Sequence, residues 1–174
     1  TPGSPSTPAA EGALLSPVTG LSTIATYAPD QWNGAAQVTE TESYGREAAA
    51  LYAQSTGTGT GTLSIELSDV PTEDVILTLV GMDDDAPTKT PIELTINTTS
   101  VYKGDSWFEN WGGTAGEGNW TTVQITIPKG MLGPGVNDIT ISNTAATGDQ
   151  GESPYIILGG ATIEVTGVTV SPIS

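Results

Sequence analysis

Five residues that suit sugar binding fall within seven positions of the sequence. They are Asp105, Trp107, Glu109, Asn110 and Trp111. Sugars stack the apolar C–H faces of their rings on Trp or Tyr side chains, while Asp, Asn, Glu and Gln bind the hydroxyl groups. The segment supplies both kinds of group, and we interpret it as a candidate carbohydrate-binding site. The alternative interpretation is that its indoles fold back and cover an open end of the domain.

A second candidate site is the run of carboxylates at Asp83, Asp84 and Asp85. Three neighbouring carboxylates repel one another, and calcium, which takes about six to eight oxygen ligands, would neutralise them. We therefore expect a structural calcium site here. The alternative is a plain turn, because Asp side chains also stabilise turns by bonding to nearby backbone. The run does not match the calcium-binding loop of an EF-hand.

The composition excludes several kinds of catalysis. The chain has no Cys and no His, so zinc sites of the Cys/His type, thiol nucleophiles and Ser–His–Asp triads are ruled out. Paired carboxylates can hydrolyse glycosides, but 20 acidic residues make chance pairs unavoidable. We do not expect an enzyme.

The net charge limits the partners. The 20 acidic residues stand against four basic ones, which gives a formal net charge of −16. Such a chain is repelled by nucleic acid and by anionic membrane surfaces. No apolar run approaches the length that spans a bilayer. We therefore predict neither a nucleic-acid partner nor membrane insertion.

The elements that must position these residues have the pattern of short β-strands. Apolar and polar residues alternate in 91–97 and 122–127, which is typical of strands with one buried and one solvated face. The segment 75–81 is almost continuously apolar, as expected of a strand in the middle of a sheet. We count roughly eight to ten short strands separated by Gly/Pro turns. The pattern predicts an all-β protein, an antiparallel β-sandwich of the jelly-roll type.

The chain divides into a tail and one domain. Residues 1–12 are rich in Pro, Ser, Thr and Gly, a composition typical of linkers between secreted modules. Two alternatives are an untidy terminus and a tail that adds a strand to a neighbour's sheet. We assign residues 13–174 to the β-sandwich domain, which is long enough to bury a core.

The stretch from Leu77 to Val165 resembles the galactose-binding-like jelly rolls. The segments that carry the resemblance are LTLVGMDDDAPTKTPIELTIN, SVYKGDSWFENW, TVQITIPKGMLGPGVNDITISNTA and PYIILGGATIEV. Modules of this kind are appended to many secreted glycoside hydrolases and lyases. The resemblance covers about half of the chain, and it implies the β-sandwich fold more strongly than any particular ligand, because one fold hosts many functions.

Together these observations predict a non-catalytic carbohydrate-binding module of a secreted or cell-surface protein. Its expected partner is a polysaccharide or another glycan. The alternative function is a structural subunit of an extracellular surface layer or filament. In that case the chain would form a homo-oligomer, with the N-terminal tail completing the sheet of a neighbour.

Overall fold

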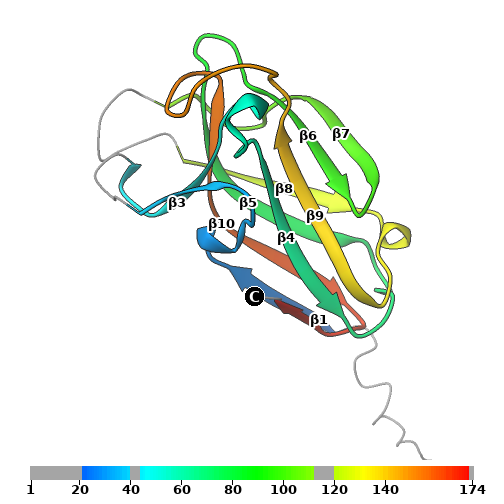
Figure 1. Ribbon diagram of the computed structural model, residues 1–174. Helices are drawn as coiled ribbons and strands as arrows, with labels where there is room; N and C mark the ends of the chain where they lie inside the picture. The colour runs from blue at the N-terminus through cyan, green and yellow to red at the C-terminus, as the bar shows by residue number, and fades with distance from the viewer. Residues whose placement is uncertain (1–20, 40–43, 112–119, 173–174) are drawn as a thin grey trace, which may run out of the picture.

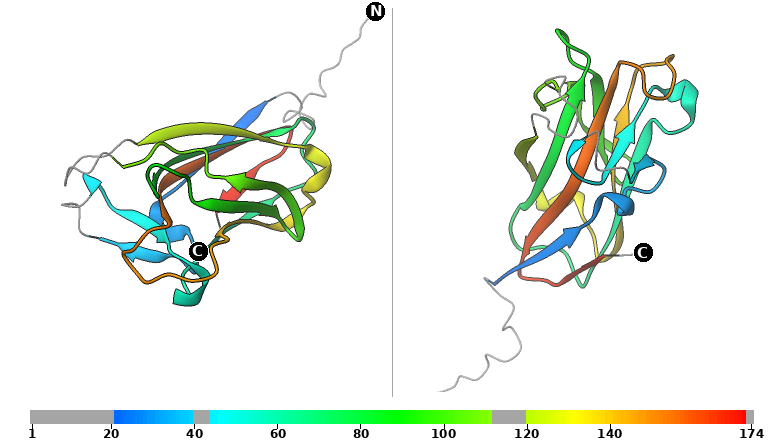
Figure 2. Two further views of the ribbon diagram at one scale, coloured as in Figure 1. Left: turned by 90° about the horizontal axis from the view of Figure 1, so that it is seen from above. Right: turned by 90° about the vertical axis from the view of Figure 1, so that its left-hand side faces the viewer.

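The computed structural model describes residues 21–39, 44–111 and 120–172. These residues form two antiparallel β-sheets that pack face to face (Figures 1 and 2). The predicted all-β fold, a sandwich of the jelly-roll type, is confirmed. The proposed tail, residues 1–12, and the proposed domain start at residue 13 lie outside the described residues, so that division stays a prediction.

One sheet has the strand order β2-β3-β10-β5-β8, and β1 also pairs with β10. Its strands are β1 (Ser22–Tyr27), β2 (Ala36–Val38), β3 (Ala48–Leu51), β5 (Val75–Asp84), β8 (Thr121–Ile127) and β10 (Tyr155–Thr166). The predicted central strand is β5, which lies between β10 and β8. Its outward residues Ile76, Thr78 and Val80 are half-buried, so the second face of this strand is only partly covered.

The other sheet has the strand order β11-β4-β9-β6-β7. Its strands are β4 (Thr60–Leu67), β6 (Pro91–Ile96), β7 (Thr99–Asp105), β9 (Gly135–Asn143) and β11 (Val170–Pro172). In the described part of the chain, three short 3-10 turns connect strands: η2 (Pro29–Gln31), η3 (Gln54–Thr56) and η4 (Lys129–Met131). Strands β7 and β8, from different sheets, are both edge strands.

The main core lies between the two sheets and follows from period-two alternation. In β4, Leu63, Ile65 and Leu67 are buried while the residues between them face outward. Each fully buried aliphatic side chain of this size stabilises the fold by about 1.5–3 kcal/mol relative to an exposed one. Trp32 is also fully buried in this core.

Strand β10 holds its sheet together because it pairs with β1, β3 and β5. The register of its pairing with β5 shifts between Leu158 and Ala161, at the Gly159-Gly160 pair. A β-bulge of this kind increases the local twist.

Candidate functional site

The predicted sugar-binding segment leaves β7 and runs alongside the end of β5. The Asp83 amide donates to the Glu109 carbonyl (2.9 Å), and the Trp111 amide donates to the Asp83 carbonyl (2.8 Å). Asp83 and Asn110 therefore form a parallel β-bridge. These backbone bonds fix residues 109–111 on the sandwich, so the position of the Trp111 side chain is set by β5.

The two indoles of this segment lie against different parts of the molecule. The Trp107 ring packs against Tyr102, with centroids 4.8 Å apart, and against the main core between the sheets. The Trp111 ring instead meets Tyr44 edge to face, at 6.4 Å. The sequence places both indoles in one candidate site, and the structure packs them against different partners.

The polar residues of the predicted site also have different surroundings from one another. Asp105 is exposed at the end of β7, where its carbonyl accepts a hydrogen bond from the Tyr102 hydroxyl (2.5 Å). Glu109 is exposed, and its amide donates to Thr121 Oγ1 (2.9 Å). Asn110 donates from Nδ2 to the Thr88 carbonyl (3.3 Å), which ties this segment to the turn after β5.

Trp111 borders a second group of aromatic side chains, on the face of the β3–β10 sheet that points away from the main core. We call it the outer aromatic cluster; its members are Tyr44, Tyr52, Trp111, Trp120 and Tyr155. Strand alternation builds it: Ile156 and Leu158 of β10 point into the main core, while Tyr155 and Ile157 point outward. Small outward residues on β3, Ala48 and Ala50, leave room for the rings.

Several contacts order the outer aromatic cluster. The Tyr52 and Tyr155 rings have centroids 5.0 Å apart, and the hydroxyls of Tyr44 and Tyr155 are 3.4 Å apart. The Trp120 indole N–H donates to the Tyr44 carbonyl (2.9 Å). Tyr44, Trp111 and Trp120 are half-buried, so part of each ring is accessible.

Charged groups flank the rings of the cluster. Asp84 is the direct cross-strand partner of Tyr155. Burial, and then hydrogen bonding to the Asp84 carboxylate and to Tyr44, raise the pKa of Tyr155 far above its ordinary value. The Arg46 guanidinium lies 4.5 Å from the centroid of the Trp120 ring. The cluster thus combines partly exposed rings with a carboxylate and a cation, which are the groups that bind sugars.

The three residues of the predicted calcium site point in different directions. Asp83 is fully buried; it accepts hydrogen bonds from the Thr90 amide (2.9 Å), the Thr90 hydroxyl (2.7 Å) and the Ser106 hydroxyl. Asp84, the next residue on the strand, faces outward beside Tyr155. Asp85 lies in the following turn and accepts from the Thr88 hydroxyl (2.9 Å).

Alternation along the strand therefore separates the carboxylates that the sequence places side by side. Within residues 21–39, 44–111 and 120–172, no three acidic side chains gather closely enough to hold a metal ion. Calcium binding by Asp83, Asp84 and Asp85 stays a prediction. In this structure the three carboxylates do not converge on one point.

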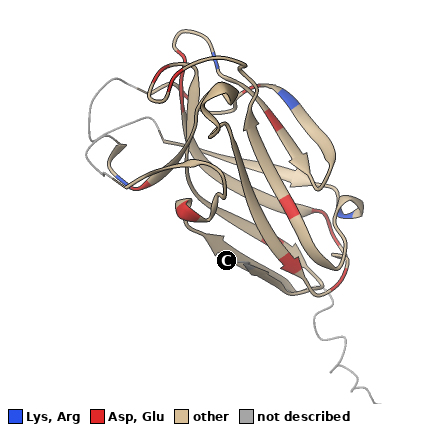
Figure 3. Ribbon diagram, viewed as in Figure 1, with Lys and Arg blue, Asp and Glu red and all other residues tan. Residues whose placement is uncertain are grey.

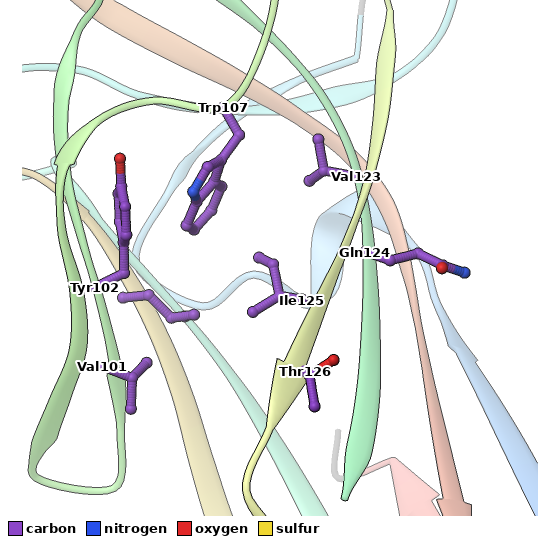
Figure 4. A pocket seen from close by; sticks show the side chains of 8 residues that line it. Val101, Tyr102, Trp107, Val123, Gln124, Ile125 and Thr126 are labelled. Carbon is purple, nitrogen blue, oxygen red and sulfur yellow. The ribbon is translucent and has the colours of Figure 1, made fainter.

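A groove lies on the other side of the predicted segment, between the edge strands β7 and β8. Its volume is about 520 Å³. Figure 4 shows Tyr102 and Trp107 facing Val123 and Ile125 across it, whereas Gln124 points away. Leu94, Val101 and Thr126 complete the lining. The walls are mostly apolar, so this groove lacks the polar groups that the outer aromatic cluster has.

Three members of the candidate site were missed or misplaced by sequence reasoning. Tyr44 and Arg46 gave no local signal, because their contact with Trp120 joins segments about 76 positions apart. Trp120 was not part of the predicted site, and it is half-buried on the outer face. An indole immediately before an edge strand is the only hint that the sequence contains.

Acidic residues are spread over strands and turns, and the four basic residues are scattered among them (Figure 3). No basic patch forms on the described surface. Nor does the described part of the chain contain any helix with the length and apolar character needed to cross a bilayer.

The chain matches no family model and no curated protein. Solved structures do match. One is the CBM36-1 domain of a multidomain xylanase from the hindgut metagenome of Trinervitermes trinervoides, at 14% identity and TM-score 0.51; the match covers 81% of this chain and 96% of that one. Another is an isomaltodextranase of Arthrobacter globiformis T6, at 15% identity and TM-score 0.52, covering 80% of this chain. A third is the catalytic unit of a GH87 α-1,3-glucanase from Streptomyces thermodiastaticus, at 12% identity and TM-score 0.52, covering 81% of this chain.

The chain spans only 23% and 26% of the two larger enzymes, but nearly the whole of the isolated module. At these identities the matches define the fold. The chain has the jelly-roll β-sandwich fold of a carbohydrate-binding module, in agreement with the resemblance carried by Leu77–Val165.

Proposed function

We propose that this domain is a non-catalytic carbohydrate-binding module and that it binds a polysaccharide or glycan through the outer aromatic cluster. The observation that carries the proposal is the meeting of three partly exposed rings, Tyr44, Trp111 and Trp120, with the carboxylate of Asp84 and the guanidinium of Arg46. The shared fold with a xylanase module supports it.

The arrangement suits a sugar for physical reasons. A pyranose ring has an apolar face that stacks on an indole or phenol ring, and its hydroxyls need hydrogen-bond partners at the edge of that ring. Trp111 and Tyr44 supply ring surface from two loops, and Asp84 lies beside Tyr155, whose hydroxyl is 3.4 Å from that of Tyr44. The backbone bonds of Trp111 and the indole bond of Trp120 hold this surface in place before a ligand arrives, which lowers the entropic cost of binding.

The setting we propose is a secreted or cell-surface protein that carries this domain next to other modules. A binding module needs no catalytic pair of carboxylates, and the cluster contains one carboxylate, Asp84, beside aromatic rings. Its role would be to keep the protein on a polysaccharide.

Binding to a panel of insoluble and soluble polysaccharides tests the proposal. We expect retention of the wild-type domain on at least one of them, and we expect Trp111→Ala and Tyr44→Ala each to weaken binding by about tenfold or more, because each removes one stacking surface. Isothermal titration with soluble oligosaccharides of the retained polysaccharide gives the affinities.

Ile24→Ala is the matched control, because Ile24 is a large apolar side chain that is 62% exposed on β1, away from the cluster. It should leave the affinity unchanged. Normal affinity in both Trp111→Ala and Tyr44→Ala would remove the cluster as the binding site, and failure of the wild type to bind any glycan would remove the function.

A further inference from the structure

A small hollow lies beside the outer aromatic cluster, over β1, β5 and β10. Its volume is about 210 Å³. We call it the threonine hollow, because three of the residues that line it are Thr. Its lining consists of Thr26, Arg46, Thr78, Val80, Thr162 and the pair Gly160-Ala161. It shares no lining residue with the groove between β7 and β8.

The register of the sheet brings the three Thr side chains together. Thr26 on β1 lies opposite Thr162 on β10, and Thr162 lies opposite Thr78 on β5. Directly opposed residues share a face of the sheet, so the three hydroxyls form a row across three neighbouring strands (Figure 1). Each hydroxyl can donate and accept a hydrogen bond. In the part of the chain that the structure describes, none of the three has a hydrogen-bond partner, so all are available to a ligand.

Trp120 and Arg46 connect the threonine hollow to the outer aromatic cluster. A Cβ added to Gly159 would stand 3.4 Å from Cζ3 of Trp120, so the indole lies over this glycine. The Arg46 guanidinium lies 4.5 Å from the centroid of the same indole and also lines the hollow. Along β10, Tyr155 therefore belongs to the cluster, Gly159 lies under the indole, and Thr162 lies in the hollow. Seven steps of about 3.3 Å separate Tyr155 from Thr162, roughly 20 Å in all.

We propose that the threonine hollow is a second subsite for sugar, so that the domain binds a stretch of polysaccharide several sugars long instead of a single sugar. This inference rests on the function proposed for the outer aromatic cluster. The polysaccharide lies along β10, with one sugar on the rings of the cluster and a later sugar in the hollow. There the apolar side chain of Val80 meets the C–H face of the sugar, and the hydroxyls of Thr78 and Thr162 bind its hydroxyl groups.

Charge selects a neutral polysaccharide. The net charge of −16 repels a chain of acidic sugars. The one charged residue that lines the hollow is Arg46, a cation, which disfavours a basic sugar there. Arg46 is exposed, and its contact among the described residues is with the Trp120 ring, without an ion pair. Its N–H groups are therefore free to donate to the hydroxyls of a neutral sugar.

Titration calorimetry of the whole chain with a trisaccharide and a hexasaccharide of the retained polysaccharide tests the second subsite. We expect the wild type to bind the hexasaccharide at least tenfold more tightly than the trisaccharide. The double variant Thr78→Val/Thr162→Val removes two hydroxyls and should weaken hexasaccharide binding about tenfold. Its affinity for the trisaccharide should not change, because the cluster alone accommodates that ligand.

Both substitutions lie at half-buried outward positions of strands, where Val is well tolerated, and circular dichroism checks the fold. Thr95→Val is the matched control, since Thr95 is a half-buried outward residue of β6 in the other sheet. It should bind both oligosaccharides as the wild type does. Ile24, the control residue for the cluster, does not line the hollow.

Amide chemical shifts in NMR spectra locate the sugars directly. The signals of Thr78 and Thr162 should move with the hexasaccharide and stay in place with the trisaccharide, while that of Tyr155 moves with both. Equal affinity for the two oligosaccharides, an unchanged hexasaccharide affinity in the double variant, or unmoved signals of Thr78 and Thr162 would each overturn the second subsite and leave the function of the cluster standing. A wild type that binds no glycan would instead remove the function, and the subsite with it.

Discussion

The hydroxyl of Tyr27 lies in the core and destabilises the fold. Its hydroxyl is buried and has no hydrogen-bond partner among the described residues, and burial raises the pKa of Tyr27 to about 12. Since a buried, unpaired hydroxyl costs about 1–3 kcal/mol, we expect Tyr27→Phe to increase the free energy of unfolding by about 1 kcal/mol. Urea unfolding followed by fluorescence measures the change.

Tyr155→Phe is the natural comparison for that prediction. Tyr155 is also nearly buried, but its hydroxyl contacts the hydroxyl of Tyr44 at 3.4 Å. Removing the Tyr155 hydroxyl should therefore lower the free energy of unfolding instead of raising it. Equal effects of the two substitutions would mean that the hydroxyl of Tyr27 finds a partner in solution.

Asp83 makes the stability of the domain depend on pH. Burial raises the pKa of this carboxyl from its usual value of 3.8, against the opposing effect of its bonds to Ser106 and Thr90. The folded state thus holds the proton more tightly than the unfolded state. The stability from this group is fully present below pH 3.8 and is lost as the pH rises through the raised pKa.

We expect Asp83→Asn to remove this dependence, because Asn does not titrate. Its free energy of unfolding should improve relative to the wild type as the pH rises above about 4. Urea unfolding at a series of pH values from about 3 to 8 gives both curves. Parallel curves for the two proteins would show that Asp83 titrates alike in the folded and unfolded states.

At the scale of elements, Phe108 connects the loop after β7 to strand β5. Its ring is buried and lies directly over Gly81, where an added Cβ would stand 2.8 Å from two ring atoms and 2.9 Å from the Ile157 carbonyl. We expect Gly81→Ala to push the ring outward, to lower the free energy of unfolding by about 1–3 kcal/mol, and to weaken glycan binding by displacing Trp111. Gly130→Ala meets nothing within 4 Å and should leave both measurements unchanged.

The sequence predicted where the strands lie better than it predicted which residues meet in the folded sandwich. Alternation in 91–97 and 122–127 identified β6 and β8, and the apolar run 75–81 identified the central strand β5. These signals are local, because one buried face repeats every second residue. The same alternation explains why the carboxylates of 83–85 separate. A strand that continues to Asp84 sends Asp83 inward and Asp84 outward, and the sequence placed the end of that strand at Gly81.

The candidate site could be predicted only in part for a related reason. An aromatic side chain in a polar loop is visible in the sequence, so Trp107 and Trp111 were noticed. The side of the sandwich against which each indole packs depends on the bridge between Asp83 and Asn110. No local sequence pattern encodes that bridge. Tyr44 and Arg46 come from a distant loop, and only the folded sheet brings them to Trp120.

At the scale of the whole molecule, charge repulsion opposes folding. A formal net charge of −16 at pH 7 is confined to one small domain, and dissolved salt screens such repulsion over about 10 Å at 0.1 M. We expect the melting temperature at pH 7 to rise by several degrees when NaCl increases from about 10 to 300 mM. Calorimetry measures the melting temperature at pH 7 and near the isoelectric point of about 4.1. Because the net charge is close to zero at the isoelectric point, salt should raise the melting temperature less there if charge repulsion is the cause. A rise of the same size at both pH values would point to a general salt effect.

Strand β10 also determines how the domain would be presented on a larger protein. Its first residue, Tyr155, belongs to the outer aromatic cluster, whereas Thr166, at its last position, pairs with Ser22 at the start of β1. Eleven steps of about 3.3 Å put the two ends of the strand roughly 35 Å apart. The chain therefore enters the described domain at Leu21, near the end of β10 that lies away from the outer aromatic cluster. A protein joined to the domain through that end would be attached on the side opposite the rings.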